Sequence, residues 1–378
     1  MRVVPFDQAA IPQSDKGKRL KQRDYLQEGS LAVIDQGQQQ IGGYTEDQSM
    51  AFDGELPVVL FGDHTRSVKL VNHRFAVGAD GIKIFRPAEG VRTKYLYYWM
   101  KSAPIPDRGY GRHYQFLRQL SVPLPSVEDQ DEIVAELEKQ FSRLDEAVAN
   151  LQRVKANLKR YKASVLKAAV EGRLVETKGG WRRSTLGEEG AIIGGLTKNQ
   201  KRNELPLKLP YLRVANVYAN ELRLDEIEYI GVAERELEKL LVRKGDLLVV
   251  EGNGSPDQIG RVALWNDAIP NCVHQNHLIK VRFGEAVLPE WALIWMLSPV
   301  GRHEIEQVSA STSGLHTLSV GKVSRLPIGV PSLKEQARIV AEVDRHLSII
   351  REVEAEIDAN LQRAQTLRQA TLSTTFSR

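Results

Sequence analysis

The sequence predicts an α+β protein with a pseudo-twofold internal repeat, in which two α/β modules are joined by two long helices packed as an antiparallel coiled coil. The main observation is a repeat at an offset of 206 residues, which relates Pro125-Ser126 to Pro331-Ser332, Gln130 to Gln336, and 133–136 to 339–342. Only two copies fit in the chain, so tandem duplication is favoured over a short-period solenoid. Heptad spacing in the repeated segments, and β-like runs between them, give the rest of the prediction.

The first predicted module covers residues 1–121. Strand-like apolar runs occur at 31–34, 58–61 and 82–85. Turn signals separate them, including Gly42-Gly43 and the segment 87–90. Short apolar runs bounded by such turns are typical of strands in an irregular α/β module.

A central helical spacer is predicted within residues 122–180, with its helix at about 126–173. Leu137, Leu144, Leu151, Leu158 and Val165 recur every seven residues, which is the spacing of a coiled-coil seam. Ser126 with Asp129 offers an N-cap pattern. Gly172 supplies a stop signal at the other end.

The second module is predicted at residues 181–329, with strands at 211–214, 246–250, 262–265 and 278–281. Trp295-Met296 in this module echoes Trp99-Met100 in the first, and both pairs are expected on short amphipathic helices. The modules otherwise match poorly, while the helices match well. This contrast indicates a shared scaffold that carries two different binding heads.

The distal helical spacer is predicted at residues 330–378, with Val343, Ile350 and Ile357 at heptad spacing. The repeat offset changes to 210 where 149–153 matches 359–363, and then returns to 206. A shift of four residues is close to one helical turn, so it changes the winding without losing the buried face. Neither helix should be stable alone, and antiparallel packing of the two is the simplest solution.

Composition limits the classes of function. The 378 residues are enough for two to three domains, and the net charge of +4 permits a DNA partner without demanding one. A basic cluster near the start, at Lys16, Lys18, Arg19, Lys21 and Arg23, is equally consistent with a solvated loop. Cys272 is the only cysteine, and no apolar run approaches the roughly 20 residues of a membrane span. We therefore expect a cytoplasmic protein with no membrane association.

The sequence carries no convincing catalytic or metal-binding pattern. It lacks a Walker-type glycine loop and the Asn-Pro-Pro-Tyr motif that positions an amino group for methylation. His274 and His277 are three residues apart on an expected strand, so their side chains should point to opposite faces. Cys272 has no identifiable base partner, and Gly109-Tyr110-Gly111 is interpreted as an ordinary turn. A non-enzymatic binding protein is expected, without metal or bound cofactor.

Polar side chains that could read DNA bases gather in the loops of both modules. Arg can recognise guanine, and Asn or Gln adenine, through paired hydrogen bonds, while Lys, Ser and Thr often hold phosphates. Any one of these residues could equally belong to a solvent-exposed turn, but the whole set favours base reading. The candidate DNA-binding residues are Gln36, Gln38, Tyr44, His64, Thr65, Arg66, Arg112, His113, Lys198, Lys201, Arg202, Asn253, Ser255, Gln258, Arg261, Asn276, His277 and His316.

The chain resembles the specificity subunits of type I restriction–modification systems. The resemblance rests on 124–134, on 329–340 with its Pro-Ser-Leu-Lys-Glu-Gln run, and on 168–174 at the end of the central helix. The segments 62–66, 181–187, 245–248 and 275–278 resemble pieces of the family's target-recognition domains. The order of head, helix, head and helix is the most specific feature.

This resemblance implies a non-catalytic subunit that reads an asymmetric, two-part sequence in double-stranded DNA, one half with each target-recognition domain. The helices would set the gap between the halves. Modification subunits, typically two in number in this family, would bring S-adenosylmethionine and methylate adenine, and restriction subunits would join them. The alternatives are a subunit of a methylation-only complex, an enzyme fragment, and a coiled-coil scaffold that binds protein alone.

Overall fold

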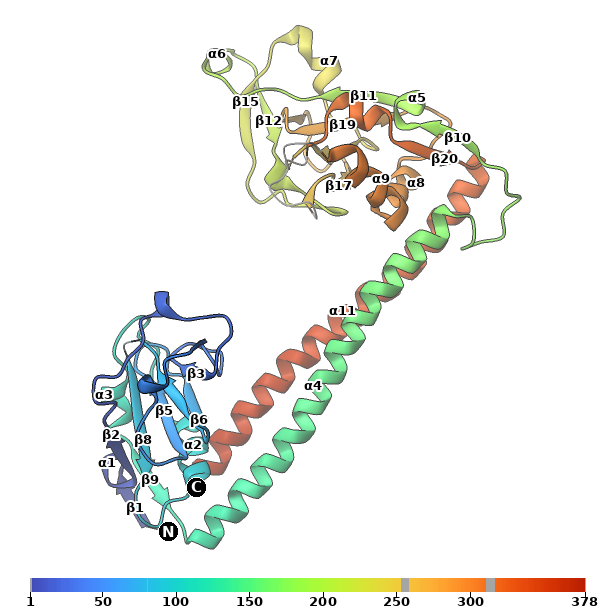
Figure 1. Cartoon of the computed structure of the whole chain (residues 1–378). Coiled ribbons are helices and arrows are strands. Elements are labelled where there is room, and N and C mark those ends of the chain that lie inside the picture. The colour runs from blue at the N-terminus through green and yellow to red at the C-terminus, as the bar shows by residue number, and fades with distance from the viewer. Residues whose placement is uncertain (1, 80, 253–257, 311–316, 378) are drawn as a thin grey trace. The chain divides into compact units, whose positions relative to one another are not determined.

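The computed structural model describes residues 2–79, 81–252, 258–310 and 317–377. It divides into two compact units, each with a head and parts of both long helices (Figure 1). Unit 1 contains Met1–Gln152 and Ile357–Arg378, and unit 2 contains Arg153–Glu356. The boundaries predicted from the sequence, at 121/122, 180/181 and 329/330, divide the chain differently, because they separate each head from the helix that follows it. This division into four domains remains a prediction.

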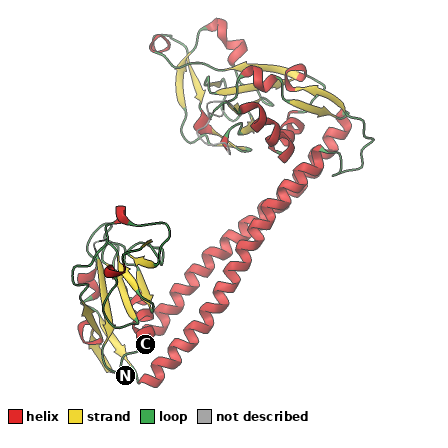
Figure 2. Cartoon of the chain, in the orientation of Figure 1, coloured by secondary structure: helices red, strands yellow, loops and turns green. Residues whose placement is uncertain are grey.

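The head of unit 1 is built on a four-stranded antiparallel sheet with the order β2-β8-β5-β6 (Figures 1 and 2). These strands are β2 (Ala10–Gln13), β5 (Val58–Gly62), β6 (Val68–Val71) and β8 (Ile82–Pro87). A second sheet has β3 (Leu31–Ile34) between β4 (Gly43–Thr45) and the parallel strand β7 (Phe75–Val77), and β1 (Arg2–Pro5) pairs with β9 (Ser121–Leu124). The helices are α1 (Phe6–Ala9), α2 (Thr93–Ser102) and α3 (Tyr114–Leu117), with short 3₁₀ turns η1 (Gln22–Asp24) and η2 (Gln48–Met50).

The head of unit 2 repeats this topology, with the sheet order β11-β19-β16-β17. These strands are β11 (Gly190–Gly194), β16 (Leu247–Val250), β17 (Val262–Leu264) and β19 (Leu278–Phe283). The second sheet has β12 (Lys208–Leu212) between β15 (Glu228–Gly231) and the parallel strand β18 (Val273–His274), and β10 (Arg182–Thr185) pairs with β20 (Pro327–Val330). The helices α5 (Leu186–Glu189), α8 (Pro289–Leu297) and α10 (Val320–Ser324) correspond by order to α1, α2 and α3.

By order, α6 (Gln200–Asn203) takes the place of η1, and η4 (Glu234–Glu236) with α7 (Leu237–Leu240) takes the place of η2. The elements of unit 2 without a counterpart among the described elements of unit 1 are α9 (Pro299–Ser309), the hairpin of β13 (Val217–Tyr218) and β14 (Glu221–Leu222), and the 3₁₀ turn η3 (Val214–Asn216). The two heads therefore share strand order and strand direction, although their sequences match poorly. Insertions change the loops around the common sheets.

The two long helices are α4 (Val127–Val170) and α11 (Leu333–Phe376), each of 44 residues. Ser126 and Ser332 cap them, because their Oγ atoms accept hydrogen bonds from Asp129 N–H and Glu335 N–H at 3.1 and 3.4 Å. At the end of α4, Gly172 has a φ of +70° and Arg173 N–H donates to Ala168 O. That arrangement is a Schellman stop, so the predicted limits of the helix hold to within a few residues.

Each head is fixed to its helix by a buried glutamine, and the two networks have the same form. Gln130 Oε1 accepts from Arg92 N–H at 2.8 Å, and its Nε2 donates to Gly90 O and Pro125 O. Gln336 makes the three equivalent hydrogen bonds, to Leu288 N, Ala286 O and Pro331 O, and both glutamines are 0% exposed. The duplicated Gln found in the sequence is thus the residue that joins the start of each long helix to the turn before α2 or α8.

Aromatic rings complete the same junctions. Tyr95 Oη donates to Pro123 O at 2.6 Å, and Trp291 Nε1 donates to Gly329 O at 3.0 Å. In unit 1 the Tyr95 ring packs edge-on against Phe376 near the end of α11. In unit 2 the core around Trp291 includes Val165 of α4. Each head therefore packs on the start of one long helix and the end of the other.

The structure differs from the sequence-based expectation at two elements. The strand expected at 211–214 is β12, which ends at Leu212, and a 3₁₀ turn begins at Val214 because Asn216 Oδ1 accepts the Arg213 N–H. The helix α8, expected to be amphipathic, is buried from Trp291 to Met296 and contributes to the core on nearly every side. α9 covers the face that would otherwise be exposed.

Candidate nucleic-acid interface

In unit 1, three connections meet at one end of the four-stranded sheet. They are the turn 63–67 between β5 and β6, the turn before β8 that contains Gly81, and the segment 103–113 between α2 and α3. Asp63 joins them, because its N–H donates to Gly81 O at 2.6 Å and its backbone O accepts from His113 N–H at 2.8 Å. Asp63 Oδ1 also accepts from Tyr114 N–H. We call this end of the head the three-loop surface of unit 1.

Unit 2 has the same arrangement around Glu251. The Glu251 N–H donates to His277 O at 2.9 Å, and its backbone O accepts from Leu318 N–H at 2.6 Å. The three connections are the β16–β17 connection, of which 251–252 and 258–261 are described, the turn 275–277, and the chain before α10. We call this the three-loop surface of unit 2. A buried or half-buried acidic residue organises both surfaces, although the loops themselves differ in sequence.

The structure brings six of the predicted residues of unit 1 together at its three-loop surface, but with different roles. Gln36 accepts from His64 N–H at 3.1 Å, and its backbone O accepts from Thr65 Oγ1. Arg66 donates to Asp107 Oδ2 at 2.6 Å, so its guanidinium fastens two loops to each other. Arg112 is exposed.

The sixth of these residues, His113, is fully buried. Its Nδ1 lies 2.9 Å from Asp63 O, and its Nε2 accepts from Arg108 N–H at 3.3 Å. The hydrogen bonds assign a neutral imidazole with the proton on Nδ1. His113 thus positions the loop 108–112, and its burial argues against the direct base contact predicted for it.

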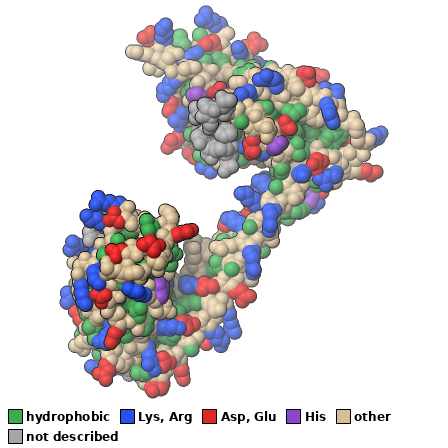
Figure 3. Space-filling view, viewed as in Figure 1, with side chains coloured by type: hydrophobic (Ala, Val, Ile, Leu, Met, Phe, Trp, Pro, Cys, Tyr) green, Lys and Arg blue, Asp and Glu red, His purple; other side chains and the backbone are tan. Residues whose placement is uncertain are grey.

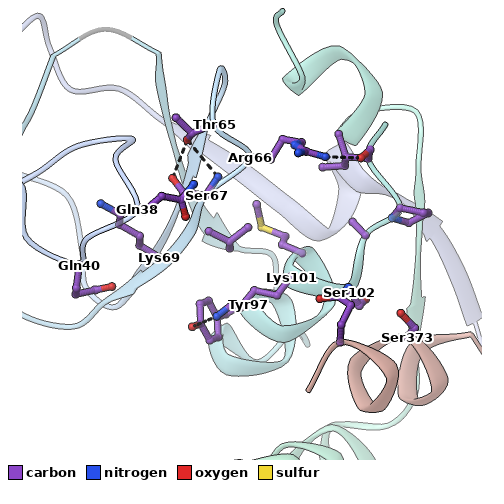
Figure 4. Close-up of a pocket in the computed structure, with 16 residues that line it drawn as sticks. Gln38, Gln40, Thr65, Arg66, Ser67, Lys69, Tyr97, Lys101, Ser102 and Ser373 are labelled. Carbon is purple, nitrogen blue, oxygen red and sulfur yellow. Dashed lines mark hydrogen bonds between the residues drawn. The ribbon is translucent and has the colours of Figure 1, made fainter. Parts of the chain in front are cut away.

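Gln38 and Tyr44 lie elsewhere in unit 1. Gln38 lines a polar groove of about 690 Å³ with Thr65, Arg66, Lys69 and Lys101, next to the turn 63–67 (Figure 4). Lys69 is 4% exposed, and burial lowers the pKa of its ammonium group. Tyr44 lines a different cavity on β4 with Tyr25 and Gln22, so it is separate from the three-loop surface.

In unit 2, four predicted residues lie at the three-loop surface. The exposed His277 pairs through Nδ1 with Glu251 Oε2 at 3.0 Å, and Asn276 is its neighbour in the turn. Arg261 Nη1 donates to Gln258 Oε1 at 3.3 Å. Asn253, Ser255 and His316 lie outside the described residues.

Lys198, Lys201 and Arg202 belong to the segment around α6. Lys198 pairs with Glu228 at 2.7 Å, and Lys201 is exposed. Arg202 makes a two-pronged ion pair with Glu236 at 3.0 Å and donates to Thr197 O and Gly231 O. That guanidinium is committed to holding the fold, which argues against a DNA contact.

Sequence reasoning included Arg261 and His64 but missed Tyr218 and Tyr110, which lie against them, and Arg223, which lies over Tyr218. Tyr218 of β13 lies under the guanidinium groups of Arg223 and Arg261, which are 3.8 and 4.7 Å from its ring centroid. In unit 1, Tyr110 is 84% exposed and stacks on His64. Alternation of arginine with an aromatic residue is the signal that could have found Tyr110, whereas Tyr218 meets Arg223 and Arg261 only in the folded head.

Two ionisable side chains, His274 and Cys272, are fully buried in the interior of unit 2. Burial, and then the charge of Lys280, lower the pKa of His274 to about 4. Burial raises the pKa of the Cys272 thiol to about 12, which keeps it protonated. His274 is buried whereas His277 is exposed, and no cluster of three metal-binding side chains occurs among the residues that the structure describes.

The eight predicted seam residues are all buried or half-buried. Leu137 in unit 1 clusters with Phe141 and Leu372, and Val165 in unit 2 belongs to the core that includes Val343 and Ile350. Ile357 is 4% exposed, whereas Leu144, Leu151 and Leu158 are half-buried. Along α4, the seam residues are therefore more buried next to the heads than in the middle of the helix.

Charges of both signs are interspersed over the visible face of each head (Figure 3). Binding to a polyanion would therefore depend on local groups of cations rather than on a uniformly basic face. No helix in the described part of the chain is both long and apolar enough to span a membrane.

Comparison with known proteins gives similarities in sequence and in fold. No protein-family model matches the chain. The chain is 28% identical over 269 residues to the type I restriction enzyme EcoKI specificity subunit of Escherichia coli (strain K12), covering 68% of this chain and 57% of the relative. It is 25% identical over 311 residues to the type I restriction enzyme StySPI specificity subunit of Salmonella potsdam, covering 77% and 66%. The chain thus spans less than two thirds of the length of these relatives.

Two solved structures share the fold. A chain from a study of complex assembly and conformational transition of the type I R-M system superposes with a TM-score of 0.71 at 16% identity, covering 99% of this chain and 97% of that one. The HsdS subunit from Thermoanaerobacter tengcongensis gives a TM-score of 0.55 at 17% identity, covering 99% and 96%. With the duplicated motifs and the repeated head topology, the chain is similar in sequence to type I restriction enzyme specificity subunits and shares the fold of an HsdS subunit.

Proposed function

We propose that this chain is the DNA sequence-reading subunit of a type I restriction–modification complex, and that each head reads one half of an asymmetric, two-part target. The observation that carries the proposal is the duplicated three-loop surface. Each head presents different polar loops at the same end of an equivalent sheet, on an acidic residue that ties the loops together. A common frame with different loops is what reading two different half-sites requires.

The two long helices would act as a spacer in the form of an antiparallel coiled coil. The seam packs Leu137 against Leu372 in unit 1 and Val165 near Val343 in unit 2, so the start of one helix meets the end of the other in both units. A stiff connection lets two weak half-site contacts act together, because binding of one head raises the effective concentration of the other. The spacer length would then set the gap between the half-sites.

The chemistry would belong to partner subunits. We propose that modification subunits, two per complex, bind this chain and transfer a methyl group from S-adenosylmethionine to adenine after flipping the base out of the duplex. Restriction subunits would complete the nuclease. This chain would contribute target choice and the assembly platform, which agrees with the naming of its relatives as specificity subunits.

The first experiment is single-molecule methylation mapping of genomic DNA from a strain that carries the modification partner, with and without this chain. A two-part adenine-methylated motif that requires the chain is the expected result, and it gives the target and the gap together. Absence of a new motif, with the partner expressed and intact, would favour a scaffold that binds protein only.

The spacer proposal has its own test. Deleting one heptad of α4, Leu144 to Asn150, with a matching heptad of α11 in unit 1, should shorten the gap in the methylated motif and leave both half-site sequences unchanged. A variant complex that methylates DNA with an unchanged gap would refute the spacer role.

A further inference from the structure

One loop of unit 1 differs from an ordinary turn in its exposed aromatic ring and in its arginine side chains, which are unpaired within the described part of the chain. It is the run Arg108-Gly109-Tyr110-Gly111-Arg112, at the tip of the segment between α2 and α3. Tyr110 is 84% exposed, more than any other large apolar or aromatic side chain among the described residues. A single exposed ring is common on protein surfaces, so the contacts and charges around Tyr110 decide whether it belongs to a binding site.

The loop has a fixed base. Arg108 N–H donates to the buried His113 ring at 3.3 Å, and Gly111 N–H donates back to Arg108 O at 3.3 Å. Asp107 accepts from Gly109 N–H at 2.9 Å and from Arg66 at 2.6 Å. Gly109, with a φ of +61°, supplies the left-handed turn that a side chain would strain. The tip is therefore held in one conformation before any partner binds, which lowers the entropy cost of binding.

The Tyr110 ring is also held in place. It stacks on the His64 imidazole with ring centroids 4.6 Å apart and an angle of 9° between the planes. His64 is itself anchored, because its N–H donates to Gln36 Oε1 at 3.1 Å. One face of the phenol ring is covered by this stack, and the large exposed fraction leaves the other face, the edge and the hydroxyl accessible.

The arginines on either side of Tyr110 differ from others on the same head. Arg66, Arg86 and Arg118 pair with Asp107, Glu55 and Asp7. The side chains of Arg108 and Arg112 are exposed and have no hydrogen-bond or ion-pair partner within the described ranges of the chain. Two unpaired guanidinium groups beside an exposed aromatic ring match the phosphates and bases of a nucleic acid.

We propose that residues 108–112 are a specificity-determining element of the first head. In this proposal Tyr110 contacts bases in the half-site read by unit 1, and Arg108 and Arg112 hold phosphates next to it. The inference rests on the proposed DNA-reading function and adds to it the residues that enter the groove. The His64–Tyr110 stack would set how deeply, and at what angle, the Tyr110 ring enters the DNA groove.

The test uses the full chain with its modification partner. Tyr110→Ala, Tyr110→Phe, Arg108→Ala and Arg112→Ala are compared with Tyr229→Ala, which removes a ring that is 66% exposed on β15 of unit 2. The assays are genomic methylation mapping, and binding of the purified complex to a duplex carrying the mapped motif at several salt concentrations. All four substituted side chains are exposed, so the five variants should fold, and thermal unfolding checks it.

We expect Tyr110→Ala to weaken binding by about tenfold or more, as loss of a base contact does, and to relax base preference in one half-site only. Tyr110→Phe should lie between Tyr110→Ala and the wild type. Each Arg variant should weaken binding evenly across sequences and lower the slope of log affinity against log salt by about one. Tyr229→Ala should match the wild type.

Three results would overturn the inference, and they are distinguishable from one another. If the wild-type chain yields a two-part motif and Tyr110→Ala leaves its sequence and occupancy unchanged, the role of the loop is rejected and the DNA-reading function stands. If the wild-type chain yields no motif with an intact partner, both are rejected. A loss of both half-sites in Tyr110→Ala, with unfolding unchanged, would also contradict a contact confined to one half.

Discussion

Replacing the buried glutamine at the base of either long helix should loosen one head and leave the other intact. In Gln336→Leu the volume is nearly kept, but Leu288 N–H, Ala286 O and Pro331 O lose their hydrogen-bond partner. All three bonds are made by a side chain that is 0% exposed, so water cannot replace them readily. At about 1 kcal/mol for each unpaired group, the expected loss is about 3 kcal/mol of the free energy of unfolding.

The duplicated sequence supplies a matched experiment. Gln130→Leu removes the equivalent three bonds in unit 1 and should cost about the same free energy. Urea unfolding measures the loss, and hydrogen exchange of peptides covering 86–100 and 284–297 assigns it to a unit. Gln140→Leu, which removes one exposed bond to Glu136, is the control and should change stability by less than about 0.5 kcal/mol.

The reasoning would be refuted by a loss below about 1 kcal/mol in either glutamine variant. Faster exchange in the unit that was not changed would also refute it. Gln336→Glu gives a further check, because it retains the acceptor for Leu288 N–H but repels two carbonyl oxygens. It should be no more stable than Gln336→Leu.

Three further predictions follow from individual contacts. His274 is buried, and its pKa is about 4 in the folded chain but near 6.5 in the unfolded chain. The free energy of unfolding should therefore fall as the pH drops from 6.5 to 5, by up to about 1.4 kcal/mol per pH unit. In urea unfolding, His274→Asn should flatten this slope. Leu372→Ala should cost about 2–5 kcal/mol and speed hydrogen exchange at the end of α11, whereas the exposed Leu367→Ala should not. Arg202→Ala should lower the free energy of unfolding by roughly 1–3 kcal/mol, whereas Lys201→Ala should leave it almost unchanged. An Arg202→Ala protein that keeps full stability but fails to bind DNA would contradict the structural role assigned to Arg202.

Much of the architecture could be predicted because its signals are local and repeated. The helices α4 and α11 begin within three residues of the predicted positions, since Ser126 and Ser332 cap them and heptad spacing continues for many turns. Most expected strands are present, because short apolar runs bounded by turns have few alternatives. The helix α8 is not amphipathic as expected, because it packs against both β17 and the following helix α9, and the residue pattern of α8 alone does not show these contacts.

The candidate surface was only partly predictable. Residue type suggested His113 and Arg202 as DNA contacts, yet His113 is buried under Asp63 and Arg202 is engaged by Glu236. The interpretation of 109–111 as an ordinary turn gave Tyr110 no role, although Tyr110 is 84% exposed and stacks on His64. Burial and pairing depend on segments distant in sequence, and a single sequence does not report them.

The sequence by itself determined the duplication, the two long helices with the Ser126 cap and the heptad seam, and the resemblance to type I restriction–modification specificity subunits. These properties depend on the spacing and type of residues close together in the sequence. The tertiary structure decided that the two heads share one strand order, that Asp63 and Glu251 each gather three loops, and that Gln130 and Gln336 join head to helix by the same three bonds. Such relations arise only when distant segments pack together, because hydrogen-bond partners and exposure are set by the folded neighbours of a residue rather than by its neighbours in sequence.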